Sequence, residues 1–254
     1  MTEPETPDQY RAARAAKVAK LRNLGVDAFG QTFQTSHSVA QARDLCPAFV
    51  ADAAEQTKGE RVVLAGRIGN LRGSGKLIFA TLFDRSRADL YQRQQLVGEE
   101  ELDSADKIKV RGIQLFCDFK VLGEHQWELL AQLDLADWIG VAGRVGRSKR
   151  GEVSVFVEQV TVLGKAMLPP PHQVGATSGE LSPETRARQR YLDLLMSDAS
   201  LHTYTLRSRL IAAVRRFFTD RGFLEVETPI LQTLPGGATA RPLVTHHNAL
   251  DTHL

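Results

Sequence analysis

Five short segments between residues 61 and 163 constrain the fold of this chain more than any other feature. Each is rich in valine, isoleucine, leucine or phenylalanine, and glycine, serine or charged residues separate it from the next. A stretch with helical spacing at Trp127, Leu130 and Leu133 lies between the third and the fourth. We predict strands over 61–68, 76–83, 112–119, 138–145 and 152–163, and a helix over 123–137.

Five strands with a helix between the third and the fourth is the element order of an OB-fold β-barrel. This barrel is a common platform for single-stranded nucleic acid, although a fold alone does not fix a function. A segment rich in proline, glycine and serine follows the barrel and indicates a domain boundary. After it, an apolar face over 203–221 predicts a helix, and "FLEVETPIL" predicts a strand over 223–231.

These patterns predict an α+β chain in four parts. They are an N-terminal helical extension (1–60), an OB-fold domain (61–166) with an insertion at about 85–112, a linker (167–184) and the beginning of a second domain (185–254).

The charge, the cysteine pattern and the lengths of the apolar runs argue against a strongly basic, a disulfide-linked, a secreted and a membrane-spanning protein. The net charge of +2 over 254 residues is small, so nucleic-acid binding would depend on local patches. Cys46 and Cys117 lie far apart and lack metal-site spacing, which favours reduced thiols in a cytoplasmic protein. The polar, acidic start is not a secretory signal, and no apolar run approaches the ~18 residues of a membrane span, so we expect no membrane partner.

The predicted helix over 8–25 carries a thin apolar stripe and five basic residues. One interpretation is a solvated surface helix, and the other is a helix that contacts phosphates. The stripe is Val18, Leu21 and Leu24, and the basic residues are Arg11, Arg14, Lys17, Lys20 and Arg22.

Several motifs resemble class II aminoacyl-tRNA synthetases. "RGFLEVETPIL" (221–231) looks like motif 1, the helix and strand that build their dimer interface. "PGGATARPLVTHHNALD" (235–251), "RQRYLDL" (188–194) and the early "KLRNLG" (20–25) resemble the lysyl-tRNA synthetase family in particular. The likeness covers most of the chain from about residue 10.

The resemblance implies that the barrel binds the anticodon of a lysine tRNA. Carried over onto matching positions, the residues that read it are Arg72, Phe79, Gln114 and Glu152. Phe79 would stack on the central uridine, and its other interpretation is an ordinary core phenylalanine. An amide such as that of Gln114 can both donate to and accept from a base edge.

The segment between Asp84 and Ile113 departs from the family, whose relatives have a short turn there. Its mixed charge predicts a solvated excursion. "RADLYQ" is a rival for the third strand, and it would put Asp89 in the place of Gln114. We prefer Gln114 because "GIQLFCDF" continues into the predicted helix.

The resemblance further implies that residues 185–254 begin a class II catalytic domain. Gly236 would approach the lysine substrate, and Gly237 and Arg241 would belong to a loop that closes over it. From residue pattern alone, the same glycines could simply form a tight turn. Phe223, Glu225 and Pro229 would lie in the motif 1 dimer interface.

A complete enzyme of this family uses ATP and Mg²⁺ to join L-lysine to its tRNA, and we expect it to be a homodimer. Motifs 2 and 3 are not in this sequence. We therefore expect the front part of a lysine–tRNA ligase, with no aminoacylation by these 254 residues alone. The alternatives are a catalytically inactive paralogue that binds tRNA or single-stranded RNA, and a fragment without function.

Overall fold

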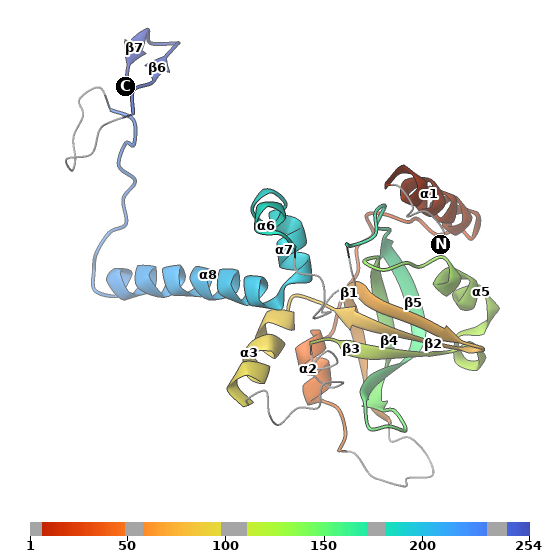
Figure 1. Ribbon diagram of the computed structural model, residues 1–254. Helices are drawn as coiled ribbons and strands as arrows, with labels where there is room; N and C mark the ends of the chain where they lie inside the picture. The colour runs from red at the N-terminus through yellow and green to blue at the C-terminus, as the bar shows by residue number, and fades with distance from the viewer. Residues whose placement is uncertain (1–6, 49–57, 98–110, 172–180, 233–242) are drawn as a thin grey trace. The chain divides into compact units, whose positions relative to one another are not determined.

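The computed structural model describes residues 7–48, 58–97, 111–171, 181–232 and 243–254 (Figure 1). The chain forms two compact units, Met1–Thr205 and Leu206–Leu254. In the first, the five predicted strands are present as β1 (Lys58–Ser74), β2 (Leu77–Phe83), β3 (Ile113–Asp118), β4 (Trp138–Arg147) and β5 (Val153–Gly164). The mixed α+β class is therefore confirmed.

The five strands close into a barrel in the order β1-β2-β3-β5-β4. Only the β3–β5 pair is parallel among these neighbours. Strand β1 is long enough to pair with β4 through its first part and with β2 through its second, and a register shift lies between Ile68 and Asn70. At this irregularity a side chain on Gly69 would collide with the Phe83 ring, so the close approach of β1 to β2 requires glycine there.

Alternate residues of the strands fill the barrel. Because successive side chains of a strand point to opposite faces, one set is buried and the other forms the outer face. The largest fully buried side chains include Val62, Leu64, Ile68, Leu82, Ile113, Leu115, Ile139, Val141, Val145 and Val155.

Helix α5 (Phe119–Ala131) follows β3, in the predicted place between the third and fourth strands. The Asp118 side chain accepts a hydrogen bond from the Lys120 amide and caps its first turn. The helix kinks at Gly123, whose φ of 73° is a conformation that favours glycine. The predicted bounds of 123–137 were therefore wrong at both ends, because the helix begins before the kink, at Phe119, and ends at Ala131.

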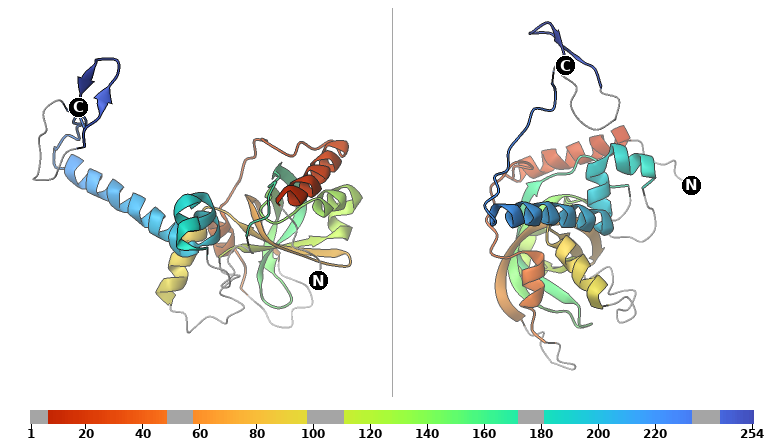
Figure 2. Two further views of the ribbon diagram at one scale, coloured as in Figure 1. Left: turned by 45° about the horizontal axis from the view of Figure 1, so that its top comes forward. Right: turned by 90° about the vertical axis from the view of Figure 1, so that its left-hand side faces the viewer.

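Helix α1 (Pro7–Asn23) lies beside the barrel near α5 in Figures 1 and 2. Val18 and Leu21 of its apolar stripe are buried, but Arg14 is buried too. The Arg14 Nη1 atom donates to the carbonyl oxygens of Ala166 (2.6 Å) and Leu168 (3.1 Å). Neither interpretation of the basic face therefore holds for Arg14, which anchors the helix to the chain after β5.

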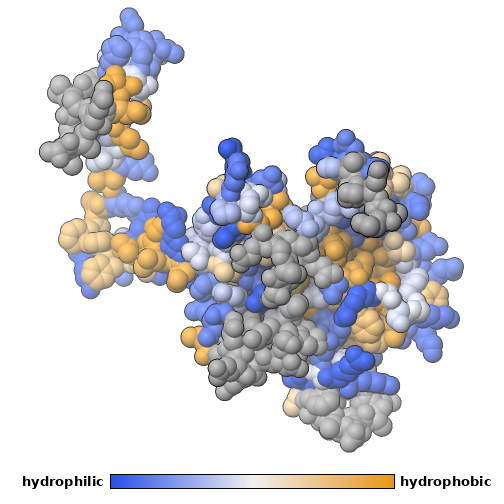
Figure 3. Space-filling view, in the orientation of Figure 1, coloured by the Kyte–Doolittle hydropathy of each residue, from blue (hydrophilic) through white to orange (hydrophobic). Residues whose placement is uncertain are grey.

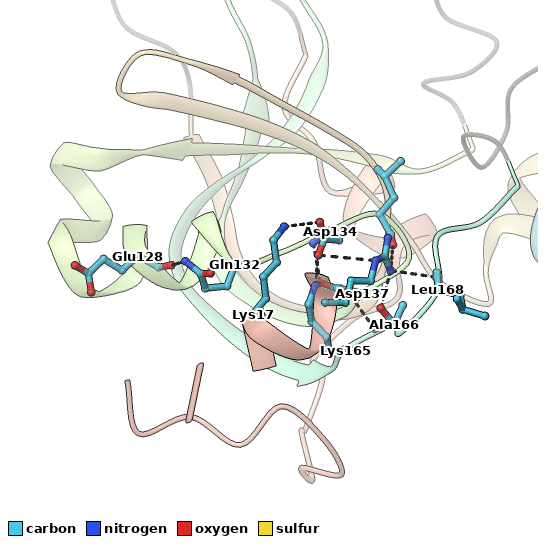
Figure 4. A network of polar contacts seen from close by, with 10 residues as sticks. Lys17, Glu128, Gln132, Asp134, Asp137, Lys165, Ala166 and Leu168 are labelled. Carbon is cyan, nitrogen blue, oxygen red and sulfur yellow. Dashed lines mark hydrogen bonds and ion pairs between the residues drawn. The ribbon is translucent and has the colours of Figure 1, made fainter. Parts of the chain in front are cut away.

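A buried ionic cluster strengthens the same attachment (Figure 4). The Lys165 ammonium contacts Asp134 and Asp137, and Lys17 of α1 lies 2.6 Å from Asp134 Oδ1. Burial raises the pKa of Asp137 above its ordinary value. Burial also acts to raise the pKa of Asp134, but hydrogen bonds from Lys165 and Lys17 outweigh it and hold that pKa below the ordinary value.

The predicted solvated excursion after Asp84 is wrong for its described part. Residues 87–97 form helix α3 (Arg87–Val97), on which Ala88 and Leu90 are buried. The rival strand "RADLYQ" is therefore helical, whereas Gln114 lies on β3 as we predicted. Asp89 is thus not an equivalent of Gln114.

Arg87 joins this inserted helix to the start of α8 (Asp198–Thr219). Its guanidinium donates to the carbonyl oxygens of Leu194 and Leu195 and lies 2.6 Å from a carboxylate oxygen of Asp198. Arg111 contacts the same carboxylate at 2.9 Å. The helix therefore helps to fix the segment that leads into α8.

Two short helices precede α8: α6 (Pro183–Arg188) and α7 (Arg190–Met196). The buried Asp193 holds them together, because its carboxylate accepts hydrogen bonds from Arg186, Arg190 and Ser200. Near the N-terminus another short helix, α2 (Val39–Asp44), has Ser38 as its cap.

In the second unit, the remainder of α8 presents an apolar surface (Figure 3). Its exposed residues include Leu206, Leu210, Val214, Phe217 and Phe218. The expected strand over 223–231 is wrong: its residues are exposed and no described strand pairs with them. A β-pattern forms a strand only where a partner satisfies its backbone groups, and Pro229 withholds one donor. Two-residue strands, β6 (His246–His247) and β7 (Thr252–His253), form the hairpin near the end.

Candidate nucleic-acid interface

A hollow of about 940 Å³ lies on the outer face of the barrel. Arg72, Phe79, Gln114 and Glu152 all line it, although they come from β1, β2, β3 and the turn before β5. The structure thus brings together the four residues that the sequence assigned to anticodon reading. The hollow is also lined by Gly73, Ser74, Leu77, Phe116, Asp118, Ser148, Lys149 and Arg150.

Phe79 faces the hollow because of its place in β2. Ala80 and Leu82 of this strand are buried in the barrel, Leu82 completely. Because successive side chains of a strand point to opposite faces, Phe79 lies on the outer face. Its ring meets Phe116 edge to face, with centroids 5.2 Å apart. This contact leaves ring surface on the wall of the hollow, where a base can stack.

Gln114 is held in one orientation by its neighbour on β5. The Ser154 hydroxyl donates to Gln114 Oε1 at 2.8 Å. Because an amide oxygen has two lone pairs, Gln114 can present to a ligand both an acceptor and the N–H donors of its amide nitrogen. Gln114 is 8% exposed, so a bond that it makes here is shielded from water. A buried amide donor suits a carbonyl oxygen on a base edge.

Glu152 is positioned by the tight turn between β4 and β5. The Ser148 amide donates to the Glu152 carbonyl at 2.8 Å, and the Glu152 amide donates to the Ser148 hydroxyl at 3.1 Å. Lys149 and Arg150, which stand within this turn, line the hollow together with Arg72. Three cations against Asp118 and Glu152 give a wall suited to phosphate, with two acceptors for base donors.

The sequence did not single out Phe116, Lys149, Arg150 or Ser154 for this site. Phe116 could have been found, since it follows Gln114 by two residues and a strand places such residues on one face. Ser154 could not, because its contact with Gln114 depends on the parallel β3–β5 pairing.

Comparison with known proteins agrees with the motifs. The family described as tRNA synthetases class II (D, K and N) matches residues 182–254. The lysine–tRNA ligase of Shouchella clausii is 37% identical over 255 aligned residues, which cover 100% of this chain and 45% of that protein. The enzyme of Bacillus subtilis is 38% identical over 98% of the chain and 44% of its own length. That of Syntrophomonas wolfei is 35% identical over 97% and 43%.

Over its whole length the chain is similar to part of the lysine–tRNA ligases, and its residues 182–254 match the class II tRNA synthetases. It spans less than half the length of the curated relatives that it matches. Only its residues from 182 onward match the family pattern, so the barrel is linked to the synthetases through the full-length relatives.

The other site residues that the family resemblance suggested belong to residues 223–241 and do not line the hollow. Gly236, Gly237 and Arg241 lie outside the described residues. Phe223 and Pro229 are exposed, as is Glu225, whose carboxylate contacts Arg215 Nε at 2.9 Å. No group of three or more His, Cys, Asp or Glu side chains within the described ranges could hold a metal ion.

The His-His-Asn segment forms part of the terminal hairpin. His246 contacts Asn248 Oδ1 through Nδ1 and Asp251 Oδ1 through Nε2, each at 3.1 Å. Its ring also packs against His253 with centroids 5.1 Å apart.

Among the described helices, none is long and apolar enough to cross a membrane.

Proposed function

We propose that this chain is the front part of a lysine–tRNA ligase whose barrel, an OB-fold domain, binds the anticodon of lysine tRNA. The carrying observation is the convergence of Arg72, Phe79, Gln114 and Glu152 on one hollow. Their spacing in sequence does not bring them together, and only the barrel topology does. The 37% sequence identity to a lysine–tRNA ligase, over the whole of this chain, supports lysine tRNA as the RNA that the barrel binds.

Each wall of the hollow has a role in this proposal. Phe79 stacks on a base, a contact worth about 1–3 kcal/mol. The Gln114 amide nitrogen donates to a base carbonyl, which suits a uridine, and Glu152 accepts from a base amino or imino group. Arg72, Lys149 and Arg150 neutralise the phosphates that connect the bases.

The complete protein joins L-lysine to its tRNA in two steps. Lysine first attacks the α-phosphate of ATP to form lysyl-adenylate, and the terminal ribose of the tRNA then takes the lysyl group. Such a site works mainly by positioning and by charge stabilisation, and Mg²⁺ supplies charge to the phosphates. No described residue of this chain is assigned to ATP or Mg²⁺.

The domain boundaries follow from the same proposal. Residues 1–60 form the helical extension, 61–166 the anticodon-binding domain, 167–184 the linker and 185–254 the beginning of the catalytic domain. Gly236, Gly237 and Arg241 then belong to the loop over the lysine. Phe223, Glu225 and Pro229 belong to a homodimer interface, which the exposed apolar surface of α8 supports. The complete enzyme works in the cytoplasm.

Binding of an anticodon stem-loop tests the proposal. The chain should bind a lysine-tRNA stem-loop, and Phe79→Ala should weaken binding by about 1–3 kcal/mol in a fluorescence anisotropy titration. Phe29→Ala, at an exposed phenylalanine outside the hollow, is the matched control. If Phe79→Ala binds as tightly as the unaltered chain, the anticodon surface is not here. For the complete protein, lysine-dependent ATP–pyrophosphate exchange tests the activity.

A further inference from the structure

A row of paired residues crosses all five strands of the barrel. Cα partners run from Arg72 on β1 through Phe79, Phe116 and Phe156 to Arg144 on β4. Ring centroids are 5.2 Å apart both between Phe79 and Phe116 and between Phe116 and Phe156. The three rings therefore stand next to one another in a row whose first and last positions are arginines, and we predicted RNA binding only for the first ring.

A second hollow of about 260 Å³ lies at the far end of this row. It shares Phe116 and Asp118 with the hollow around Phe79, so the Phe116 ring is a common wall. An extended single strand that fills the first hollow can therefore continue into the second without leaving the barrel surface. The remaining lining residues are Lys58, Val121, Phe156, Val157 and Glu158.

The second hollow has the groups that a nucleotide requires. Lys58 Nζ lies 5.3 Å from the centroid of the Phe156 ring, which is 7% exposed. Because the lysine ammonium is a compact charge on a flexible stem, it can move from the ring to a phosphate and open the ring face.

Two carboxylates, Asp118 and Glu158, line the second hollow. Glu158 is held by Arg61 Nε at 3.0 Å and Arg144 Nε at 3.8 Å, and Asp118 accepts from the Lys120 amide. Ionised carboxylates only accept hydrogen bonds. They favour a base edge with an exocyclic amino group, as in adenine, cytosine and guanine, over the uracil edge, because the single imino N–H of uracil is flanked by two carbonyl oxygens that repel a carboxylate.

We propose that the second hollow holds the nucleotide next to the anticodon, with its base stacked on Phe156 beside Phe116 and its phosphate on Lys58. The inference rests on the proposed anticodon site in the first hollow. It adds a specificity-determining position that prefers an amino-bearing base.

Stem-loop titrations with altered RNA test this assignment. The probes are a lysine-tRNA anticodon stem-loop and two copies in which the nucleotide on the 5′ or the 3′ side of the anticodon is abasic. We expect Phe156→Leu to weaken binding of the intact probe about five- to tenfold, within the range of one base stack. One of the abasic probes should bind equally weakly to the unaltered chain and to Phe156→Leu, because both changes remove the same contact. Replacing the base at that side by uridine should also weaken binding to the unaltered chain.

Lys58→Met tests the phosphate contact without removing an aromatic ring. It should lower the affinity and reduce the salt dependence of binding by about one phosphate charge. Arg188→Met, at an arginine of α6 whose side chain is 77% exposed and which lies outside both hollows, is its matched control. Thermal unfolding of each variant separates a binding effect from a folding defect.

The outcomes separate this inference from the proposed function. If Phe79→Ala weakens binding but Phe156→Leu and Lys58→Met do not, the first hollow stands and the second is not a nucleotide site. An equal loss in Arg188→Met would show that Lys58 acts only through its general charge and would overturn its role as a phosphate contact. If the unaltered chain does not bind the stem-loop at all, the proposed function fails and the inference fails with it.

Discussion

Replacing Lys165 by methionine tests whether the buried ionic cluster holds the barrel to its flanking segments. The ammonium of Lys165 is fully buried and contacts Asp134 and Asp137, of which Asp137 is also fully buried. Methionine is of similar length but carries no charge, so the change leaves two carboxylates without their shared cation. The Asp137 carboxylate keeps hydrogen bonds only from the amides of Ala166 and Asp134.

The magnitude follows from the burial of this pair. Removing one partner of a buried ion pair costs about 3–5 kcal/mol, because the remaining charge is stranded away from water. For a folded unit of this size, each kcal/mol lowers the melting temperature by about 2–4 °C. We therefore expect Lys165→Met to melt roughly 6–20 °C below the unaltered chain by circular dichroism.

Lys17→Met is the matched control, because Lys17 contacts Asp134 alone and its side chain is 32% exposed. A partly exposed pair contributes about 1 kcal/mol or less. If Lys165→Met melts no lower than Lys17→Met, the reasoning from burial is refuted.

The pH dependence of the loss gives a second check. Burial already raises the pKa of Asp137, and without Lys165 that pKa should rise further. A carboxyl whose native pKa exceeds its unfolded value destabilises the fold when it is ionised, so stability returns as the pH falls through the native pKa towards the unfolded value near 4. The difference between Lys165→Met and the unaltered chain should therefore shrink in mild acid. A constant difference across this window would show that the loss does not come from a stranded Asp137 charge.

Two further predictions concern the inserted helix and the thiols. Arg87→Met should lower the free energy of unfolding by about 3–5 kcal/mol in urea titrations, because it leaves the buried Asp198 with one cation fewer. Arg93→Met, at an exposed ion pair of the same helix, should lower it by about 1 kcal/mol or less. Equal losses in the two variants would exclude an anchoring role for the helix. Burial raises the pKa of both thiols, that of Cys117 to about 12, but Cys46 is partly exposed whereas Cys117 is buried. A thiol reagent at pH 8 should therefore modify Cys46 alone in the native chain and both thiols after unfolding. Rapid native modification of Cys117 would contradict its burial.

The barrel was predictable because its information is local. Runs of β-branched and aromatic residues define each strand, and the apolar spacing around Leu130 indicates the helix between β3 and β4, although not its ends. The face of Phe79 was not predictable from its immediate neighbours, because Ile78 and Phe79 are both apolar. The buried Leu82 decides the side, and that burial is known only once β2 pairs with β1 and β3.

The inserted helix and the strand expected over 223–231 show where local information ends. Arg87 is buried because Asp198, far along the chain, supplies the opposite charge, and a mixed-charge sequence looks solvated until that partner is known. For the segment 223–231, the local pattern predicted an element that did not form. Its apolar alternation favours a strand, but a strand also needs a partner, and the described residues provide none.

The arrangement of aromatic residues on the barrel argues that its outer face binds a ligand at one place. The interior is filled by aliphatic residues such as Leu64, Ile113 and Val141, so the fold does not require rings outside it. Yet Phe79, Phe116 and Phe156 stand on three adjacent strands, in register, beside arginine and lysine side chains. Apolar rings gathered with cations on an outer face suit bases and phosphates together, which neither an aliphatic patch nor a charged patch alone can bind. In the function that we propose, the barrel interior accounts for stability and this row accounts for recognition.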